Sequence, residues 1–377
     1  MRIVRVANFV TPRSGGLRTA LRHLGMGYAA AGHEPVLVVP GPEAAEEQTE
    51  QGLVITLPGP QVPSMGGYRV LLDRRRVAAT LRELRPDRVE VSDRTTLRWV
   101  GRWARRRDVP SMMVSHESLD GLLRLFGPAP GRRIADFLNG RTAADYDRIV
   151  CTTRWAAAEF ERIGAANVTR VPLGVDLERF SPGLRDATMR ARWARPDDVL
   201  LLHCGRLSAE KRPRRSIEAL AGLRMAGVPA VLVVAGAGPL LPALRAEAAE
   251  RELPVRFLGY LGDPAELAAL LATADVVIAP GPVETFGLAA LEALASGTPV
   301  VASAESALSE VIGSAGLAAP GEGADYGKAV LELMSRPVDA RRAAAREQAE
   351  RFPWSAAVTG FLAAHAVATD SVPGAVG

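Results

Sequence analysis

The chain is 377 residues long, which exceeds what one hydrophobic core usually supports, so we expect two domains of ordinary size. Hydrophobic residues make up 48% of the sequence and charged residues 23%, a balance typical of globular proteins that excludes disordered and membrane-spanning classes. No apolar run reaches the length of a membrane span, and residues 1–10 are typical of a first strand without the apolar region of a signal peptide, so a cytoplasmic protein is expected. Cys151 and Cys204 lie in apolar strand-like runs, which favours buried free thiols over a disulfide or a metal site.

The charge is distributed unevenly along the chain. Residues 1–175 hold 26 Lys and Arg against 18 Asp and Glu, a net charge of +8, whereas the whole chain carries +4. Arginine runs at 74–76, 105–107 and 132–133 contribute to this excess. They could meet a phosphate-bearing acceptor, anionic lipid or nucleic acid, and a plain solvated surface is an equal alternative.

Short apolar runs alternate with amphipathic segments along the chain, a pattern that predicts parallel sheets covered by helices. The first series of expected strands comprises Ile3–Phe9, Val36–Val39, Val54–Leu57, Arg88–Val91, Ser111–Val114, Ile149–Thr152 and Thr169–Val171. The second series comprises Val199–Cys204, Val231–Ala235, Val255–Leu258, Val276–Ala279 and Val300–Ser303.

Helices are expected between the strands, for example over Leu17–Ala31, where Gly32 provides a C-cap signal. Segments 40–43 and 58–67 contain Pro and Gly and are expected to be loops. The stretch Pro172–Pro182 is the best linker between the two series. We therefore predict an N-terminal domain over 1–174, a C-terminal domain over 175–351, and a last helix within 352–377.

Open parallel sheets bind ligands beyond the carboxyl ends of their strands, so the turns that follow strands are the candidate sites. The turn at 11–16 ends in Gly15 and Gly16 and opens a helix, where backbone N–H groups face an anion. A plain turn is the alternative for this segment. His116 follows the strand Ser111–Val114, where it is either a ligand-contacting group or a structural imidazole.

Two cations follow the first strand of the second series. Arg206 and Lys211 come directly after Val199–Cys204, at the point where a phosphate would bind, although both are equally compatible with ordinary surface charges. Of the 46 basic residues only Lys211 and Lys328 are lysine, so the lysine at 211 stands out.

The loop from Pro280 runs into a helix that is stopped by Gly297. From Leu288 to Ala295 every residue is apolar except Glu292, and a carboxylate on so apolar a helix requires partners. A ribose or sugar diol would supply two hydroxyl donors, and the amides at the start of the helix would receive phosphate.

These residues together resemble the retaining glycosyltransferases of family 4, which have the GT-B fold: two Rossmann-like α/β domains whose parallel sheets face each other across a cleft. The resemblance rests on Gly15–Gly16, His116, Val171–Asp176, Arg206 with Lys211, and the pair Glu284 and Glu292, which seven residues separate. It covers nearly the whole chain, and Glu284–Val301 is its most specific part. The resemblance also implies that the last helix, within 352–377, crosses back to the N-terminal domain and is followed by a tail.

The resemblance implies a role for each of these residues. Arg206 and Lys211 would hold the donor diphosphate, Glu292 the nucleotide ribose, and Glu284 with Thr285 the region of the donor sugar. Phe286, Gly287 and Leu288 would present amides to phosphate. His116 would contact the donor sugar beside the reaction centre, and Gly15 with Gly16 would line the donor site. The loop before Glu284, which contains Pro280 and Pro282, and the pair Arg212–Pro213 depart from the family pattern, which weakens any assignment of the donor.

The segments Gly205–Arg212 and Pro280–Phe286 look most like actinobacterial members that transfer mannose from GDP-mannose. UDP-glucose and UDP-N-acetylglucosamine remain open as donors. The expected acceptor is a lipid, an inositol-type molecule or another polar molecule, with peripheral membrane contact through the basic first domain. No cofactor, metal or nucleic acid is expected.

Four other functions are alternatives to this one. A nicotinamide dehydrogenase would need a third glycine where Gly236-Ala-Gly238 is followed by Leu241. A metal-dependent transferase would use Asp145 and Asp147, which precede a strand rather than follow one. A sugar-nucleotide epimerase and a catalytically silent sugar-nucleotide binder share the expected architecture, and assays of product and turnover distinguish them.

Overall fold

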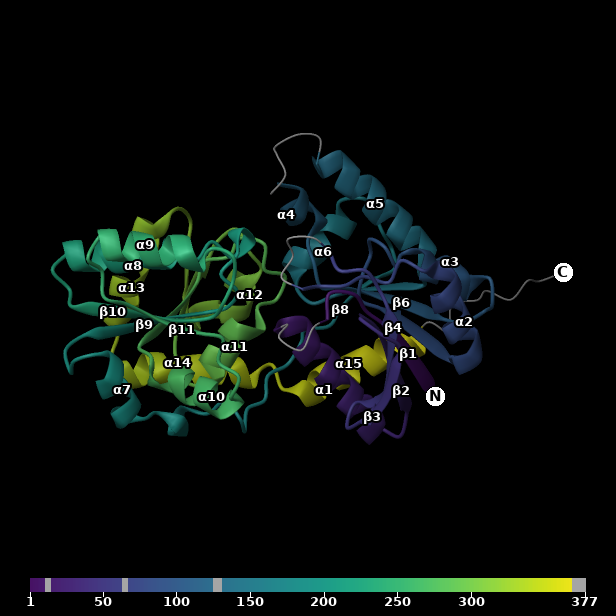
Figure 1. Cartoon of the computed structure of the whole chain (residues 1–377), viewed down its shortest axis with the longest axis horizontal. Coiled ribbons are helices and arrows are strands. Elements are labelled where there is room, and N and C mark those ends of the chain that lie inside the picture. Colours follow the sequence, from purple (N-terminus) through teal and green to yellow (C-terminus); the bar gives the residue numbers. More distant parts are fainter. Residues whose placement is uncertain (11–14, 63–66, 125–130, 368–377) are drawn as a thin grey trace. The chain divides into compact units, whose positions relative to one another are not determined.

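The computed structural model describes residues 1–10, 15–62, 67–124 and 131–367. The chain divides into two compact units, one made of Met1–Gly174 with the chain from Trp354 onward, the other of Val175–Pro353. The boundaries expected at 174/175 and 351/352 lie at or within two residues of these divisions. Both units are α/β, with helices packed on a mainly parallel sheet (Figure 1).

The elements of the first unit follow one another in this order: β1 (Arg2–Val6), α1 (Gly16–Ala30), β2 (Glu34–Gly41), β3 (Ala45–Thr49), β4 (Gly52–Pro58), α2 (Arg74–Leu84), β5 (Arg88–Val91), α3 (Trp99–Arg105), β6 (Ser111–Ser115), α4 (Leu119–Arg124), α5 (Gly131–Asp145), β7 (Arg148–Cys151), α6 (Arg154–Glu161), β8 (Val168–Arg170) and α15 (Trp354–Val367). Its eight-stranded sheet has the order β3-β4-β2-β1-β5-β6-β7-β8, and only the β3–β4 pair is antiparallel.

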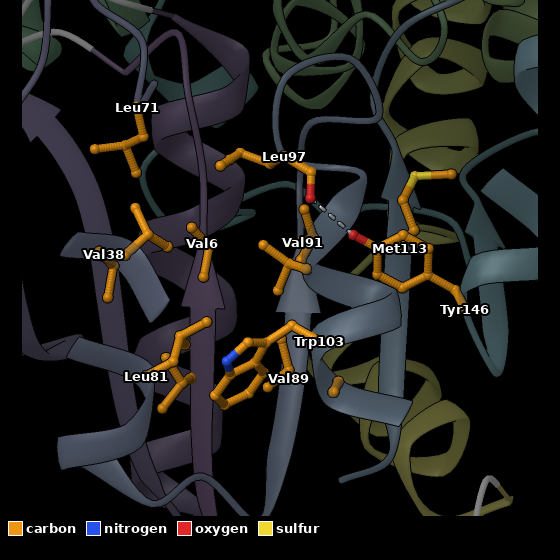
Figure 2. Close-up of a cluster of buried hydrophobic side chains, with 14 of the residues drawn as sticks. Val6, Val38, Leu71, Leu81, Val89, Val91, Leu97, Trp103, Met113 and Tyr146 are labelled. Atoms are coloured by element: carbon orange, nitrogen blue, oxygen red, sulfur yellow. Dashed lines mark hydrogen bonds between the residues drawn. The ribbon is translucent and has the colours of Figure 1, made fainter. Parts of the chain in front are cut away.

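Most strands of this unit are buried apolar runs, which explains why they could be predicted from the apolar residues in the sequence. Val6, Val89 and Val91 pack with Trp103 and Tyr146 in the core, where the Tyr146 hydroxyl donates to the Leu97 carbonyl at 3.3 Å (Figure 2). The sequence analysis missed β3 because its Ala-Glu-Glu-Gln-Thr sequence is almost entirely exposed at the sheet edge. It was also wrong to place a loop over 40–43, since β2 extends to Gly41 in register with Pro58 of β4.

The last helix, α15, packs within the first unit. A Cβ on Gly27 of α1 would lie 2.2 Å from the Val358 side chain, so the glycine permits close approach of the two helices. The His365 imidazole is 3.2 Å from the Glu90 carboxylate, which also accepts from the Tyr28 hydroxyl at 2.9 Å. Three distant segments of the chain thus share one buried polar network.

The second unit contains the following elements: η1 (Pro182–Leu184), α7 (Ala187–Trp193), β9 (Val199–Cys204), η2 (Ala209–Lys211), α8 (Arg214–Met225), β10 (Ala230–Ala235), α9 (Leu241–Glu250), β11 (Val255–Gly259), α10 (Pro264–Thr273), β12 (Val276–Ala279), α11 (Leu288–Ala295), β13 (Val300–Ser303), α12 (Leu308–Ile312), η3 (Gly313–Ala315), β14 (Leu317–Ala319), α13 (Gly323–Met334) and α14 (Val338–Glu350). Its sheet is all parallel, in the order β11-β10-β9-β12-β13-β14. The short strand β14 was not expected.

In both units, several helices begin directly after a residue whose side chain caps the helix N-terminus. Asp73, Thr153, Asp186 and Asp263 accept backbone N–H groups at the first turns of α2, α6, α7 and α10. In the described residues, no helix combines the length and the apolar character that crossing a bilayer requires. Both cysteines are free thiols as expected, although Cys204 is only partly buried.

Candidate active site

In the second unit, the loops after β9 and β10 pack against each other at the carboxyl edge of the sheet. A Cβ on Gly236 would lie 1.8 Å from the Gly205 carbonyl oxygen, and one on Gly238 would lie 2.4 Å from the Leu207 carbonyl oxygen. Both glycines are therefore required by the close approach of two protein loops. This packing accounts for the partial glycine fingerprint without any dinucleotide.

The structure brings Lys211 and Glu284 together although 73 positions separate them. The Lys211 ammonium, at the end of η2, donates to the Glu284 carboxylate in the loop after β12. The two side chains are 32% and 24% exposed, so each remains accessible from solvent. Arg206 is half-buried at the start of the same loop as Lys211, directly after β9. Cations thus lie at the end of the central strand of this sheet.

The start of α11 offers free backbone donors. Gly287 precedes the helix with φ of 80°, a conformation that favours glycine, and a Cβ there would lie 2.2 Å from Leu308 Cδ2. Within the described residues, the amides of Phe286, Gly287 and Leu288 donate to no backbone or side-chain acceptor. A helix N-terminus with unpaired amides is an anion-binding arrangement.

The side chains of Thr285 and Phe286 are buried. The Phe286 ring packs edge-to-face on Phe352 at a centroid distance of 5.9 Å. Phe286 can therefore act on a ligand only through its backbone, while its ring fixes the loop against the unit's own core.

Glu292 lies in the middle of α11, half-buried, and no group in the described chain donates a hydrogen bond to its carboxylate. Burial raises the pKa of Glu292 to about 7, and the nearby Arg179 only partly opposes this. Burial, with a smaller contribution from Glu292, also raises the pKa of the Cys204 thiol to about 12, so the carboxylate lies near the end of β9. A desolvated carboxylate without a donor is a candidate ligand group.

The other predicted residues lie in the first unit. His116 follows β6 and is half-buried, and burial lowers its pKa to about 4, so its imidazole is neutral at physiological pH. Gly15 precedes α1, and a Cβ there would meet no atom of the described residues within 4 Å, so packing against them does not require this glycine. Gly16 begins α1, whereas residues 11–14 of the same turn lie outside the described residues. Strands β1 and β6, which precede these positions, flank β5 in the sheet.

Sequence analysis missed two residues that hold the site loops. Glu159 of α6 accepts from the Ser118 hydroxyl and from the amides of Leu119 and Asp120 at 3.3 and 3.2 Å, which fixes the segment after His116. Arg215 of α8 donates to the Pro280 carbonyl at 3.4 Å and to Glu322. The partners of Arg215 are distant in the sequence, and Glu159 lies about 40 residues from the segment that it holds, so no local signal could have revealed either role.

The carboxylates considered for a metal have structural partners. Asp147 accepts from the Ser111 amide at 2.8 Å and from its hydroxyl at 3.0 Å. Asp145 lies 3.6 Å from Arg98 and 3.5 Å from Arg102. In the described part of the chain, no group of three or more His, Cys, Asp or Glu residues is arranged to hold a metal ion.

Sequence families match both units. Glycosyltransferase Family 4 matches residues 14–179, and Glycosyl transferases group 1 matches residues 185–352. A GDP-mannose-dependent alpha-(1-6)-phosphatidylinositol dimannoside mannosyltransferase of Mycobacterium tuberculosis is 51% identical over 366 residues, which cover 96% of this chain and 95% of that protein. A D-inositol 3-phosphate glycosyltransferase of Geodermatophilus obscurus is 33% identical over 73% of this chain and 65% of its own length.

Solved structures share the fold along the whole chain. Anabaena HepE in complex with UDP and glucose has a TM-score of 0.75 at 16% identity and covers 98% of this chain and 99% of its own. Sucrose-phosphate synthase from Thermosynechococcus elongatus has a TM-score of 0.75 at 22% identity, with 98% and 100% coverage. The chain is an enzyme of the GT-B fold and belongs to the glycosyltransferases of family 4 and group 1.

Proposed function

We propose that this glycosyltransferase transfers mannose from GDP-mannose to a phosphatidylinositol-linked mannoside, with retention of the anomeric configuration. The 51% identity to the phosphatidylinositol dimannoside mannosyltransferase carries the proposal, because it extends over 96% of this chain and so includes both units. A GDP-mannose-dependent alpha-mannosyltransferase of Corynebacterium glutamicum, 27% identical over 80% of the chain, supports the same donor. The transfer takes place at the cytoplasmic face of the membrane.

The donor nucleotide binds at the carboxyl edge of the second unit's sheet. Arg206 and Lys211 neutralise the diphosphate, and the unpaired amides at the start of α11 add hydrogen bonds to it. Glu292 accepts hydrogen bonds from both ribose hydroxyls, which supply the donors that its carboxylate lacks. Glu284 orients the sugar hydroxyls, held in place by its ion pair with Lys211.

Catalysis rests on stabilising the leaving group. As the bond between the sugar's anomeric carbon and the phosphate oxygen breaks, negative charge grows on the diphosphate, and cations fixed beside it favour the transition state. His116 hydrogen-bonds the donor sugar as a neutral imidazole, in keeping with its pKa of about 4. Gly15 and Gly16 let the backbone before α1 approach the donor closely.

Transfer is independent of a metal ion, since Lys211 and Arg206 supply the positive charge at the diphosphate. The test is transfer by the purified protein with and without EDTA. Unchanged turnover supports this scheme, whereas abolished turnover that magnesium or manganese restores overturns it.

A donor screen tests the proposed function itself. Calorimetry with GDP-mannose, UDP-glucose and UDP-N-acetylglucosamine should give tight binding for GDP-mannose alone, and the bound donor should yield a mannosylated lipid when the acceptor is added. Preference for a UDP-sugar, or an epimerised nucleotide sugar formed without acceptor, would refute it.

A further inference from the structure

One face of the first unit combines exposed apolar side chains with unpaired positive charge. On α5 the residues Ala135, Asn139, Thr142 and Asp145 are buried at helical spacing, and they attach this helix to the unit. The opposite side of α5 is exposed: Ile134 is 43% and Phe137 62% exposed. Phe137 has the larger exposed fraction of the two, and both are costly to leave in water.

Only arginines and apolar residues occupy the exposed positions of α5. These positions are Arg132, Arg133, Ile134, Phe137, Arg141 and Ala144. The Arg141 guanidinium lies 5.6 Å from the centre of the Phe137 ring. Of the carboxylates on this 15-residue helix, Asp145 is buried and Asp136 pairs with Arg162 of α6, so neither compensates the exposed arginines in the described chain.

The neighbouring helix α3 also carries arginines on its outer side. It packs on the end of α5, where a Cβ on Gly101 would lie 2.5 Å from the Asp145 carbonyl oxygen (Figure 1). Its outer side carries a shallow pocket of about 300 Å³. The residues that line this pocket are Trp99, Arg102, Trp103, Arg106 and Arg107.

Positive charge is crowded where the two helices meet. Arg98 and Arg102 share the single carboxylate of Asp145. Burial and the nearby guanidiniums of Arg141 and Arg102 lower the pKa of Arg98, although Asp145 opposes this. Like charges held this close are destabilising unless a further anion approaches them.

We propose that this α3/α5 face, formed by the exposed residues of α5 and the pocket residues of α3, docks the enzyme on an anionic phospholipid bilayer. The proposal rests on the proposed function in one respect, because a lipid acceptor brings the enzyme to a membrane. Ile134 and Phe137 enter the boundary between headgroups and acyl chains, as the apolar side of an interfacial helix does. The arginines contact lipid phosphates.

A bilayer fits this face better than a soluble anion does. A free phosphate or a nucleic acid would satisfy the arginines but leave Ile134 and Phe137 exposed to water. An apolar protein partner would cover these two side chains but leave the guanidiniums of α3 without counter-ions. Only a surface with both an apolar interior and an anionic layer matches both features.

The experiment measures sedimentation of the full chain with vesicles of equimolar phosphatidylglycerol and phosphatidylcholine, against pure phosphatidylcholine. Ile134→Ser/Phe137→Ser removes the apolar side chains, and Arg106→Gln/Arg107→Gln removes two charges from the pocket. Each arginine near an anionic membrane contributes about fivefold to binding, so the second variant should bind roughly 25-fold more weakly. All four residues are outside the candidate active site, and thermal unfolding checks that both variants remain folded.

The matched control removes two exposed arginines from the second unit. Arg192→Gln/Arg195→Gln changes the net charge by the same amount and should leave vesicle binding nearly unchanged. Equal losses in this control and in the pocket variant would mean that overall charge alone attracts the enzyme, and the proposal would fall. Equal binding to both kinds of vesicle would also overturn it.

A second readout reports insertion directly. An environment-sensitive fluorophore on Phe137→Cys should shift its emission when anionic vesicles are added, whereas the same fluorophore on Met225→Cys, an 87% exposed position of the second unit, should not. Inorganic phosphate or a duplex oligonucleotide, added at matched ionic strength, should leave the emission of the Phe137→Cys conjugate unchanged. A shift with either of them would assign the face to a soluble anion.

Activity separates this proposal from the proposed function. The apolar and pocket variants should keep wild-type turnover with a mannosylated inositol phosphate that lacks acyl chains, and lose turnover with the same headgroup embedded in vesicles. A wild-type enzyme that transfers mannose to neither acceptor contradicts the proposed function, while vesicle binding still decides the docking face.

Discussion

We expect Glu292 to couple the stability of the fold to nucleotide binding. Burial raises the pKa of this carboxyl from 4.5 to about 7, a shift that corresponds to about 3 kcal/mol at 1.36 kcal/mol per unit. Since the side chain is only half-buried, solvent screening reduces this figure, and we expect about 1–2 kcal/mol. A carboxyl whose pKa is higher in the folded chain destabilises the fold when it ionises. The penalty is absent below pH 4.5, grows towards pH 7 and is complete above it.

Glu292→Gln should therefore raise the free energy of unfolding by about 1–2 kcal/mol at alkaline pH and leave it unchanged at acidic pH. The same variant should bind GDP more weakly by roughly 1–3 kcal/mol, since a hydrogen bond from the ribose to a charged acceptor is lost. Urea unfolding at two pH values and titration calorimetry measure the two effects. Glu332→Gln, at a 64% exposed side chain, is the control and should change neither.

The reasoning is refuted if Glu292→Gln gains no stability at alkaline pH and binds GDP with wild-type affinity. A gain in stability without a loss of affinity would separate the two claims. The carboxylate would then be desolvated but would not contact the nucleotide.

Three further predictions concern the loops and the buried network. Lys211→Ala and Arg206→Ala should each lower kcat roughly 10²–10³-fold at saturating donor. Lys211→Arg should be only partly active, because a guanidinium does not replace a compact ammonium. Wild-type kcat in Lys211→Ala would remove this residue from the mechanism. Arg212 has φ of 46°, a left-handed conformation, so Arg212→Gly should raise the free energy of unfolding by about 1 kcal/mol, and a lower melting temperature would contradict this. Burial would raise the pKa of Glu90, but its hydrogen bond with His365 and neighbouring charges hold the pKa below the usual 4.5. The stabilisation from Glu90 is therefore complete above pH 4.5 and lost as the pH falls through its lower folded value. His365→Ala should cost about 1–3 kcal/mol at neutral pH, because the buried carboxylate keeps only the hydrogen bond from the Tyr28 hydroxyl. Acid and urea unfolding of both proteins check this, and equal stability of the variant and the wild type would refute it.

The alternation of apolar runs and helices was enough to predict the fold, because buried parallel strands are nearly continuous in apolar residues. Elements that lack this signal were missed. The strand β3 is polar and exposed at an edge, and β14 has only three residues. The left-handed backbone of Arg212, which arginine adopts at some cost, was not visible in the sequence either.

The candidate site was only partly visible in the sequence. Glu292 was identifiable because it is the one charge on an apolar helix, and the structure gives it no described hydrogen-bond donor. The ion pair of Lys211 with Glu284 depends on tertiary contact between loops 73 positions apart, which spacing cannot supply. The supporting roles of Glu159 and Arg215 likewise arise only when distant helices pack.

Transfer of mannose by the purified chain tests the central claim most directly. The protein is incubated with GDP-mannose labelled in the sugar and with a phosphatidylinositol mannoside in vesicles, and the extracted lipid is analysed by mass spectrometry and by NMR of the new anomeric centre. We predict one added α-linked mannose and release of GDP. No transfer to this lipid, a β-linked product, or equal transfer from a UDP-sugar would contradict the account.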